Sequence, residues 1–363
     1  MPDIGKSSKE AYFADFLKVC FVCKDFNLNR GSYRIWIDDL NSTLISLGIS
    51  SRKVIVDEVS DITENIILFD KGISEDEIIN IRSKIIVDNK VLGVINPPAD
   101  SNLSVDFAIA GSIEESSTLI NYKKVFIIPL IEKRLHDNYI QKLYNNEVEL
   151  KLCYHGNSFH LSAFESSGLR LAIEEFETEL ANIGKKVKLT IISESESPTW
   201  IIGKPKINNI SYIRYNWETF PSILREQDIG LVPNCYFSQS SGFFDKILKK
   251  IFRFEYDKTD IIMRMKNKSN FGRLLVFMQL GVPAIADLTP SHLILMANGN
   301  CGYCVSNKQG WISSLRELLV EEKREYVARN ARSFIDNNYT PHKWAHNFLE
   351  ALDMEFGNYL KNQ

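Results

Sequence analysis

The residue types best suited to chemistry gather in one short stretch of this chain, between residues 266 and 273. The stretch contains hydrogen-bond donors and positive charges and no carboxylate: Lys266, Lys268, Ser269, Asn270, Gly272 and Arg273. A helix is expected to begin here, because apolar residues recur with helical spacing from Leu274 to Met278. The amino end of a helix attracts anions, so the stretch predicts a site for a phosphate group.

The elements around this loop predict where it lies in the fold. A short apolar strand, Ile229–Val232, precedes it, and the turn Leu280–Pro283 leads into a second strand, Ala284–Ala286. Strand, loop, helix, Gly-Pro turn and strand is the order of a parallel βαβ unit. In open parallel sheets ligands bind beyond the carboxyl ends of the strands, which is where the basic loop is expected.

This segment resembles the donor-binding core of GT-B glycosyltransferases, in particular the group-1 set that decorates bacterial surface polysaccharides. The residues that carry the resemblance are Leu274 to Asp287, with Gln227 to Pro233 before them and the turn Gly302 to Val305 after them. It implies an α/β fold of two Rossmann-like doubly wound domains facing across a cleft, with a C-terminal helix that crosses back. One departure is that Lys268 and Val276 stand where many retaining members carry two glutamates. Sugar identity and stereochemistry therefore stay open.

The resemblance also implies roles for single residues. Arg273 and Lys268 would offset the negative charge of a diphosphate leaving group, so no metal and no other cofactor is expected. His155 is the third candidate for catalysis, as a hydrogen-bond donor to phosphate or sugar, with a structural role as the alternative. The expected donor-binding residues lie at strand ends and in the basic loop: Gly156, Asn157, Ser158, Trp217, Ser269, Asn270, Asp287, Pro290 and Ser291.

Three further residues follow the first predicted strand. Arg30, Gly31 and Ser32 are expected to form an acceptor or cleft loop, since glycine lets the backbone approach a ligand closely. The alternative is an ordinary capped helix start at Ser32. Similar alternatives hold elsewhere, because Trp217 also fits a packing role and Asp287 also fits a helix cap.

Strand-like and helix-like runs alternate along the whole chain and predict three parts. An N-terminal acceptor-side domain is expected over residues 15–145, a donor-side domain over 148–340, and a C-terminal helix over 341–363. The predicted strands include 18–24, 65–69, 84–87, 91–95, 106–110 and 124–128, then 150–154, 187–192, 210–215 and 303–305. One long helix is predicted over about 165–183, residues 313–337 are helical by their period, and Gly48 is expected to end the helix that includes Ile35 to Leu47.

The segment Gly242 to Phe254 has an amphipathic helical pattern. Lys246, Lys249, Lys250 and Arg253 share one face, and Phe244, Ile247, Leu248 and Ile251 share the other. Such a helix binds an anionic membrane surface, with Phe244, Lys249 and Lys250 as the expected contacts. A helix packed on its own domain with a solvated lysine face fits the pattern equally well.

Composition limits the remaining choices. The 363 residues are enough for two domains, and a net charge of −3 favours no nucleic-acid partner. The first residues lack the apolar core of a secretory signal, so a cytoplasmic protein is expected, peripheral at the inner membrane face if the segment 242–254 binds lipid. Cys20 and Cys23 stand three apart in a strand and face opposite sides, which favours buried reduced thiols over zinc.

Together these observations predict a metal-independent glycosyltransferase, retaining in mechanism. It would move a sugar from a nucleoside-diphosphate sugar to a glycan or lipid-linked acceptor in cell-surface polysaccharide synthesis. Two alternatives stay open: a catalytically silent GT-B binding module, which the missing glutamates allow, and a GT-B nucleotide-sugar epimerase.

Overall fold

A computed structural model describes residues 8–59, 61–85, 90–99, 101–140, 142, 148–234, 270–297 and 300–361. The described residues form two compact units. The first takes them from Met1–Asn138, Asn270–Leu275 and Ile335–Gln363, and the second from Tyr139–Ser269 and Val276–Phe334. Each unit is described by itself below. Lys268, Ser269 and the predicted amphipathic segment Gly242 to Phe254 lie outside the described residues.

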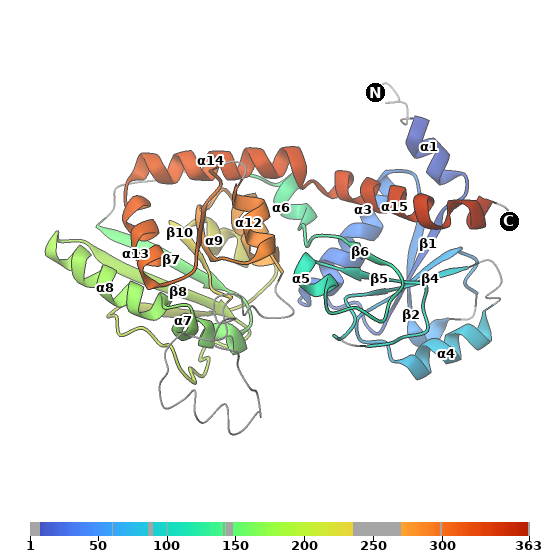
Figure 1. Cartoon of the computed structure of the whole chain (residues 1–363), viewed down its shortest axis with the longest axis horizontal. Coiled ribbons are helices and arrows are strands. Elements are labelled where there is room, and N and C mark those ends of the chain that lie inside the picture. Colours follow the sequence, from blue (N-terminus) through green and yellow to red (C-terminus); the bar gives the residue numbers. More distant parts are fainter. Residues whose placement is uncertain are drawn as a thin grey trace. The chain divides into compact units, whose positions relative to one another are not determined.

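The first unit is built on a parallel sheet of six strands. The order across the sheet is β2 (Ser50–Ile55), β1 (Lys18–Cys23), β3 (Ile66–Phe69), β4 (Val91–Ile95), β5 (Phe107–Ala110) and β6 (Val125–Ile127). Its helices are α1 (Ser8–Ala14), α2 (Gly31–Tyr33), the π-helix Arg34–Asp39, α3 (Leu40–Ser46), the 3-10 turn Val56–Glu58, α4 (Glu75–Lys84), α5 (Ile113–Ser116), α6 (Lys133–Asp137) and α15 (Pro341–Lys361) (Figure 1).

Both faces of this sheet are covered, which explains the continuous apolar sequences of its inner strands. One face packs on the helical run from Gly31 to Ser46 and on α15, whose buried residues include Phe348 and Leu349. The other face packs on α4 through Ile78 and Ile81. Cys23 belongs to the first cluster and Cys20 to the second, so the two thiols face opposite sides as predicted. Burial raises the pKa of each to about 12, which keeps both as neutral thiols.

The second unit is built on another parallel sheet of six strands. The order is β12 (Tyr303–Val305), β11 (Ala284–Asp287), β10 (Ile229–Val232), β7 (Glu149–His155), β8 (Lys186–Ser193) and β9 (Ile210–Arg214). Its helices are the 3-10 helix Ser158–Ser162, α7 (Ala163–Ser166), α8 (Leu169–Asn182), α9 (Phe220–Arg225), α11 (Gly272–Gln279), α12 (Pro290–Ala297), α13 (Lys308–Glu317) and α14 (Glu321–Asn338). Within the chain, α11 passes from the first unit to the second after Leu275, and α14 returns after Phe334.

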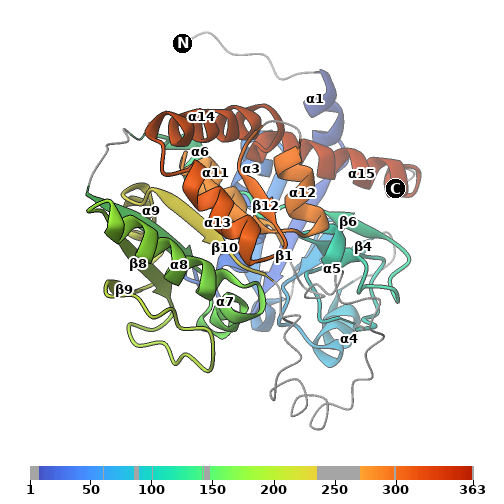
Figure 2. The ribbon, with the colours of Figure 1, turned by 60° about the vertical axis from the view of Figure 1, so that its left-hand side comes forward.

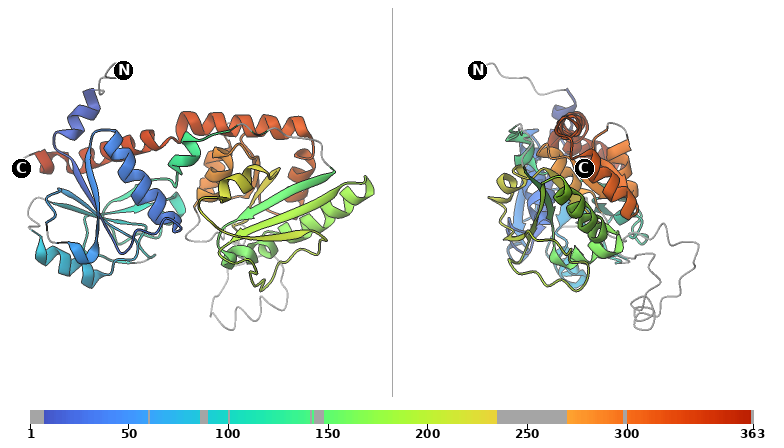
Figure 3. Two further views of the ribbon diagram at one scale, coloured as in Figure 1. Left: turned by 180° about the vertical axis from the view of Figure 1, so that it is seen from behind. Right: turned by 90° about the vertical axis from the view of Figure 1, so that its left-hand side faces the viewer.

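Helices α8 and α13 lie side by side over one face of the second sheet (Figures 2 and 3). Phe176 of α8 and Trp311 of α13 belong to the same buried cluster as Leu152 and Leu189 of the strands. On β10, a Cβ added to Gly230 would lie 2.6 Å from the ring of Phe277 in α11. The absence of a side chain at Gly230 therefore lets α11 approach the strand closely.

The predicted fold class, α/β with two doubly wound parallel sheets, is confirmed. Gly48 ends the helical run as predicted, with a φ of 82° that favours glycine. The single predicted helix over 165–183 is wrong, because Gly168 takes a φ of 76° and separates α7 from α8. The helical period predicted over 313–337 is divided between two helices, since α13 ends at Glu317 and α14 begins at Glu321.

Two further differences concern the first sheet. The strand predicted over 84–87 does not begin at residue 84, because Lys84 is the last residue of α4. A capping box begins that helix, in which Ser74 Oγ accepts from Glu77 N (3.3 Å) and Glu77 Oε2 accepts from Ser74 N (2.6 Å). Strand β2, which was not predicted, is a polar edge strand that pairs only with β1 among the described strands.

Candidate functional site

Each sheet has one place where the strand order reverses, and ligands in open parallel sheets bind beside it. In the first sheet it lies between β1 and β3, and in the second between β7 and β10. All pairs are parallel, so the carboxyl ends of the strands share one edge of their sheet. The loops at that edge contain most of the described residues that the sequence predicts to bind or react.

His155 ends β7 at the reversal point of the second sheet, and only 8% of it is exposed. Its ring lies edge-on to Phe277, with 4.9 Å between ring centroids, and tilted on Phe220 at 6.2 Å. Gly156 follows with a φ of 142°, in the region that favours glycine, while its N–H still donates to Ile192 O (3.0 Å). His155 is thus held by aromatic packing at the carboxyl edge.

Asn157 and Ser158 open the 3-10 helix that follows. Asn157 Oδ1 accepts from Phe159 N (2.8 Å), which caps this helix. The backbone N–H of Ser158 donates to Glu194 Oε2 (2.9 Å), and the Ser158 hydroxyl donates to Glu194 Oε1. Glu194 follows β8 and was not among the predicted site residues, because nothing in its local sequence indicates a partner in another loop.

The end of β11 holds a buried polar network. Asp287 is 0% exposed, and its Oδ2 accepts from the backbone N–H of Asn234, the second residue after β10 (2.5 Å). His292 Nδ1 lies 2.8 Å from Asp287 O, and His292 N donates to Thr289 Oγ1 (3.2 Å).

The other two residues predicted here belong to the start of α12. Pro290 opens the helix and is half-buried, and Ser291 is 2% exposed. The side chain of Asp287 therefore ties the ends of β10 and β11 together, and its contact with a sugar stays a prediction.

Trp217 follows β9 and is half-buried. It lies in a turn held by Asn216, whose Oδ1 accepts from Glu218 N (2.8 Å) and Thr219 N (3.4 Å). The turn leads into α9, where Phe220 packs on Tyr215 with ring centroids 5.0 Å apart. The structure thus places the indole at the carboxyl edge without assigning it a ligand.

Arg273 is the second residue of α11 and is half-buried. Asn270, just before the helix, uses Oδ1 to accept from Gly272 N (3.1 Å). Its Nδ2 donates to Glu115 Oε1 (2.9 Å), and Glu115 Oε2 accepts from Gly111 N (2.7 Å). Asn270, Gly272, Glu115 and Gly111 all belong to the first unit. The buried carboxylate of Glu115 therefore anchors the amino end of α11 in that unit.

At the reversal point of the first sheet, Arg30 forms two ion pairs. Its Nη2 lies 2.5 Å from Asp70 Oδ2, which follows β3, and 3.1 Å from Asp25 Oδ1, which follows β1. Burial raises the pKa of the Asp70 carboxyl, although Arg30 acts against this. Gly31 and Ser32 begin α2 and are half-buried. Arg30 therefore links the two strands that flank the reversal point.

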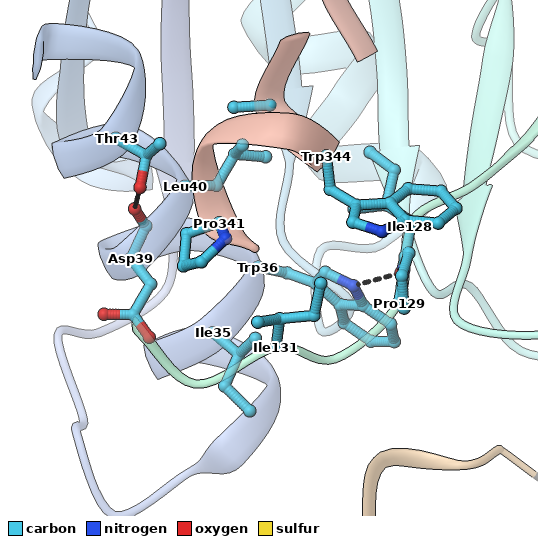
Figure 4. Close-up of a pocket in the computed structure, with 11 residues that line it drawn as sticks. Ile35, Trp36, Asp39, Leu40, Thr43, Ile128, Pro129, Ile131, Pro341 and Trp344 are labelled. Carbon is cyan, nitrogen blue, oxygen red and sulfur yellow. Dashed lines mark hydrogen bonds between the residues drawn. The ribbon is translucent and has the colours of Figure 1, made fainter. Parts of the chain in front are cut away.

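A cavity of the first unit, drawn in Figure 4, is too small for a substrate. It measures about 30 Å³ and lies between Trp36, Pro129 and Trp344. A water molecule needs at least about 10–15 Å³, so this space fits one or two waters. Trp36 Nε1 closes one wall by donating to Ile128 O (2.8 Å).

Solved structures share this architecture. HepE from Anabaena, in complex with UDP and glucose, is 9% identical, with 93% of this chain and 100% of that chain covered and a TM-score of 0.53. The trehalose-6-phosphate synthase OtsA is 11% identical over 88% of this chain and 77% of that one, at a TM-score of 0.54. No protein-family model matches the chain, and no curated protein sequence does.

A third such structure is longer than this chain. It is a point mutant of TarM from S. aureus, in complex with fondaparinux, α-GlcNAc-glycerol and UDP. It is 12% identical over 78% of this chain, at a TM-score of 0.51, and this chain spans about half of it (54%). At such identities the likeness shows the fold: this chain has the GT-B fold of glycosyltransferases. Among the described residues, no helix is long and apolar enough to cross a membrane.

Proposed function

We propose that this protein is a glycosyltransferase that moves a sugar from a nucleoside-diphosphate donor to a glycan or lipid-linked acceptor. The observation that carries the proposal is the GT-B fold, in which each parallel sheet has polar loops at the carboxyl edge beside its reversal point. Structures with this fold hold UDP, as HepE and TarM do. We therefore take UDP-sugars as the first donors to test.

Arg273 and Lys268 supply the electrostatics of the proposed reaction. The acceptor hydroxyl oxygen bonds to the anomeric carbon of the sugar while the bond from that carbon to the diphosphate oxygen breaks. Negative charge grows on the departing diphosphate, and fixed cations stabilise it. In a retaining reaction the departing phosphate takes the proton of the acceptor, so no separate protein base is needed.

We further propose that transfer needs no divalent metal, because these side chains supply the positive charge. Turnover in excess EDTA should then match turnover in buffer. Loss of turnover in EDTA, restored by magnesium or manganese, would contradict this part of the proposal. The surface-polysaccharide pathway and a membrane-surface role for residues 242–254 also belong to the proposal.

The test is incubation of the protein with a panel of UDP- and GDP-sugars, followed by mass spectrometry. A glycosyltransferase releases UDP or GDP slowly from its own donor even without an acceptor, and faster when a suitable glycan is added. Conversion of the donor to its C2 epimer would instead identify an epimerase. If no donor is consumed, the protein is a binding module and the proposal is wrong.

A further inference from the structure

A cavity of about 400 Å³ opens in the second unit, at the carboxyl ends of β7 and β8. Strand β7 is paired with β8 along its whole length, up to His155 beside Ile192. The 3-10 helix Ser158–Ser162 forms one wall, and the loop of residues 194–201 forms the other. Ligand pockets typically span about 300–1,000 Å³, so this cavity has room for a nucleoside or one to two sugar rings.

A fixed carboxylate stands in this cavity. Glu194 is held by the N–H and the hydroxyl of Ser158, from the opposite wall. Partial burial acts to raise the pKa of the Glu194 carboxyl, but the hydrogen bonds from Ser158 and the nearby His160 outweigh it, and the pKa lies below its ordinary value. Glu194 is therefore ionised at neutral pH. A carboxylate has about four lone-pair sites; Ser158 makes three contacts with it, one of them a longer share of its N–H with Oε1 (3.3 Å), which leaves about one or two sites for a ligand.

The other lining residues define which ligands suit this carboxylate. None of the described residues that line the cavity is a lysine or an arginine, so a phosphate would meet the negative charge of Glu194 with neither of these cations in the wall. Ser162, Ser197 and Thr199 add small hydroxyl groups to the wall. Phe159 lines the same space with 66% of the residue exposed, and its ring offers an apolar face. An anionic group is disfavoured here, and a neutral polyhydroxylated ring is favoured.

We propose that this cavity binds a neutral ring with two adjacent hydroxyl groups, which donate to Glu194 while the ring stacks on Phe159. The inference rests on the proposed function, since a glycosyltransferase meets such a ring in two forms. One is the ribose of the nucleotide donor, and the other is a sugar ring of the glycan acceptor. Glu194 then supplies a carboxylate for sugar hydroxyls in a chain that has Lys268 and Val276 at the two positions where many retaining enzymes carry glutamates.

Calorimetric titration tests the proposal with three ligands: UDP, 2′-deoxy-UDP and maltose. The proteins compared are the wild type, Glu194→Gln, Phe159→Leu and the control Glu196→Gln. Glu196 is an exposed glutamate two residues away that does not line the cavity. Glu194→Gln keeps the shape of the side chain and weakens two charge-assisted hydrogen bonds, so binding of the diol ligand should fall roughly ten- to hundred-fold. Phe159→Leu, at an exposed position, should weaken the same ligand without unfolding the protein.

The pattern of results separates the two sources. If the wild type prefers UDP over 2′-deoxy-UDP at least tenfold and Glu194→Gln loses that preference, the ring is ribose. If maltose binds the wild type and is lost in both cavity variants but not in Glu196→Gln, the ring belongs to a glycan. If Glu194→Gln and Phe159→Leu bind every ligand as the wild type does, this inference is overturned, while donor turnover by the wild type still supports the proposed function. If no ligand binds the wild type and no donor is consumed, this inference and the proposed function are both overturned.

Discussion

Arg273 is the described residue on which the proposed chemistry depends most. It lies in the first turn of α11, where a guanidinium and the amino end of a helix both attract phosphate. Loss of one charge-assisted hydrogen bond costs about 1.5–3 kcal/mol, so Arg273→Ala should weaken UDP binding roughly ten- to hundred-fold. Calorimetric titration measures this, with Arg329→Ala on the exposed side of α14 as the control. If Arg273→Ala binds UDP as tightly as the control Arg329→Ala does, Arg273 is not part of the phosphate site.

Asp39 should make the stability of the protein depend on pH. Burial, with smaller contributions from Glu132 and Asp38, raises the pKa of its carboxyl to about 7, although the hydrogen bond from Lys133 N (3.0 Å) and the Arg34 charge act against this. The folded state therefore keeps a proton on Asp39 that the unfolded chain loses above the ordinary aspartate pKa of 3.8. The free energy of unfolding should fall as pH rises from about 4 to 7, by up to about 1.4 kcal/mol per unit.

Asp39→Asn isolates this contribution, because its amide oxygen still accepts from Lys133 N and carries no charge. Urea unfolding of both proteins between pH 4 and 8 gives the measurement. The stability of the wild type relative to the variant should decline up to about pH 7 and then stay level. A difference that is flat over this range, or that rises, would show that Asp39 ionises normally in the folded protein.

For the candidate site, the sequence predicted which loops the described residues lie in, but not their hydrogen-bond partners. The position of His155, Asn157 and Asp287 at the carboxyl edge was predictable, because they end or follow apolar strands and the carboxyl ends of parallel strands meet at one edge. Their partners were not found. The bonds Ser158–Glu194, Asn234–Asp287 and Asn270–Glu115 join residues 36, 53 and 155 positions apart. Such pairs arise from tertiary packing, which residue spacing along the chain does not contain.

At the scale of elements, Gly230 in β10 determines how closely α11 packs. Because an added Cβ would lie 2.6 Å from the Phe277 ring, Gly230→Ala should force Phe277 to move. Overpacking of this kind costs about 1–3 kcal/mol. Urea unfolding of Gly230→Ala, of Phe277→Leu and of the double variant tests the contact. The double variant should lose less stability than the sum of the two single variants.

His155 gives this prediction a second readout, since its ring also rests on Phe277 at 4.9 Å. The chemical shift of the His155 ring protons should move in Gly230→Ala. Gly184→Ala serves as the control, because a Cβ there meets nothing within 4 Å. Its φ of 72° costs about 1–2 kcal/mol by itself, with no effect on His155. If the double variant loses as much stability as the sum of Gly230→Ala and Phe277→Leu, α11 moves to accommodate the added methyl group without a clash at Phe277.

Elements buried on both faces were the easiest to predict. β4 and β10 have the predicted bounds, Val91–Ile95 and Ile229–Val232, because short apolar runs between polar residues define them. β2 escaped prediction because Ser50, Ser51, Arg52 and Lys53 have none of the apolar pattern of a buried strand. The break between α7 and α8 depends on the positive φ of Gly168. The helical spacing of apolar residues continues across that glycine, so the pattern alone predicts one helix.

At the scale of the whole molecule, the first unit cannot be completed by the N-terminal part of the chain alone. The core of this unit includes five buried residues of α15, some 200 residues later: Ala345, Phe348, Leu349, Leu352 and Leu360. Each buried Leu or Phe stabilises by about 1.5–3 kcal/mol, and the total is comparable to the whole stability of a domain, about 5–15 kcal/mol. α1 adds polar contacts to the same helix, such as Lys9 Nζ to Glu350 Oε1 (2.9 Å).

A fragment of residues 1–138 should therefore fail to fold cooperatively, and a peptide of residues 335–363 added in trans should restore a cooperative urea transition. Circular dichroism follows both. The peptide with Leu349→Asp should not restore the transition, since Leu349 is 0% exposed, whereas the peptide with Met354→Asp should, since Met354 is 86% exposed. If the fragment alone unfolds cooperatively and the peptide adds nothing to its stability, α15 only covers a core that is already complete. In that case the C-terminal helix would be dispensable for the first unit, and the apolar face of α15 would require another explanation.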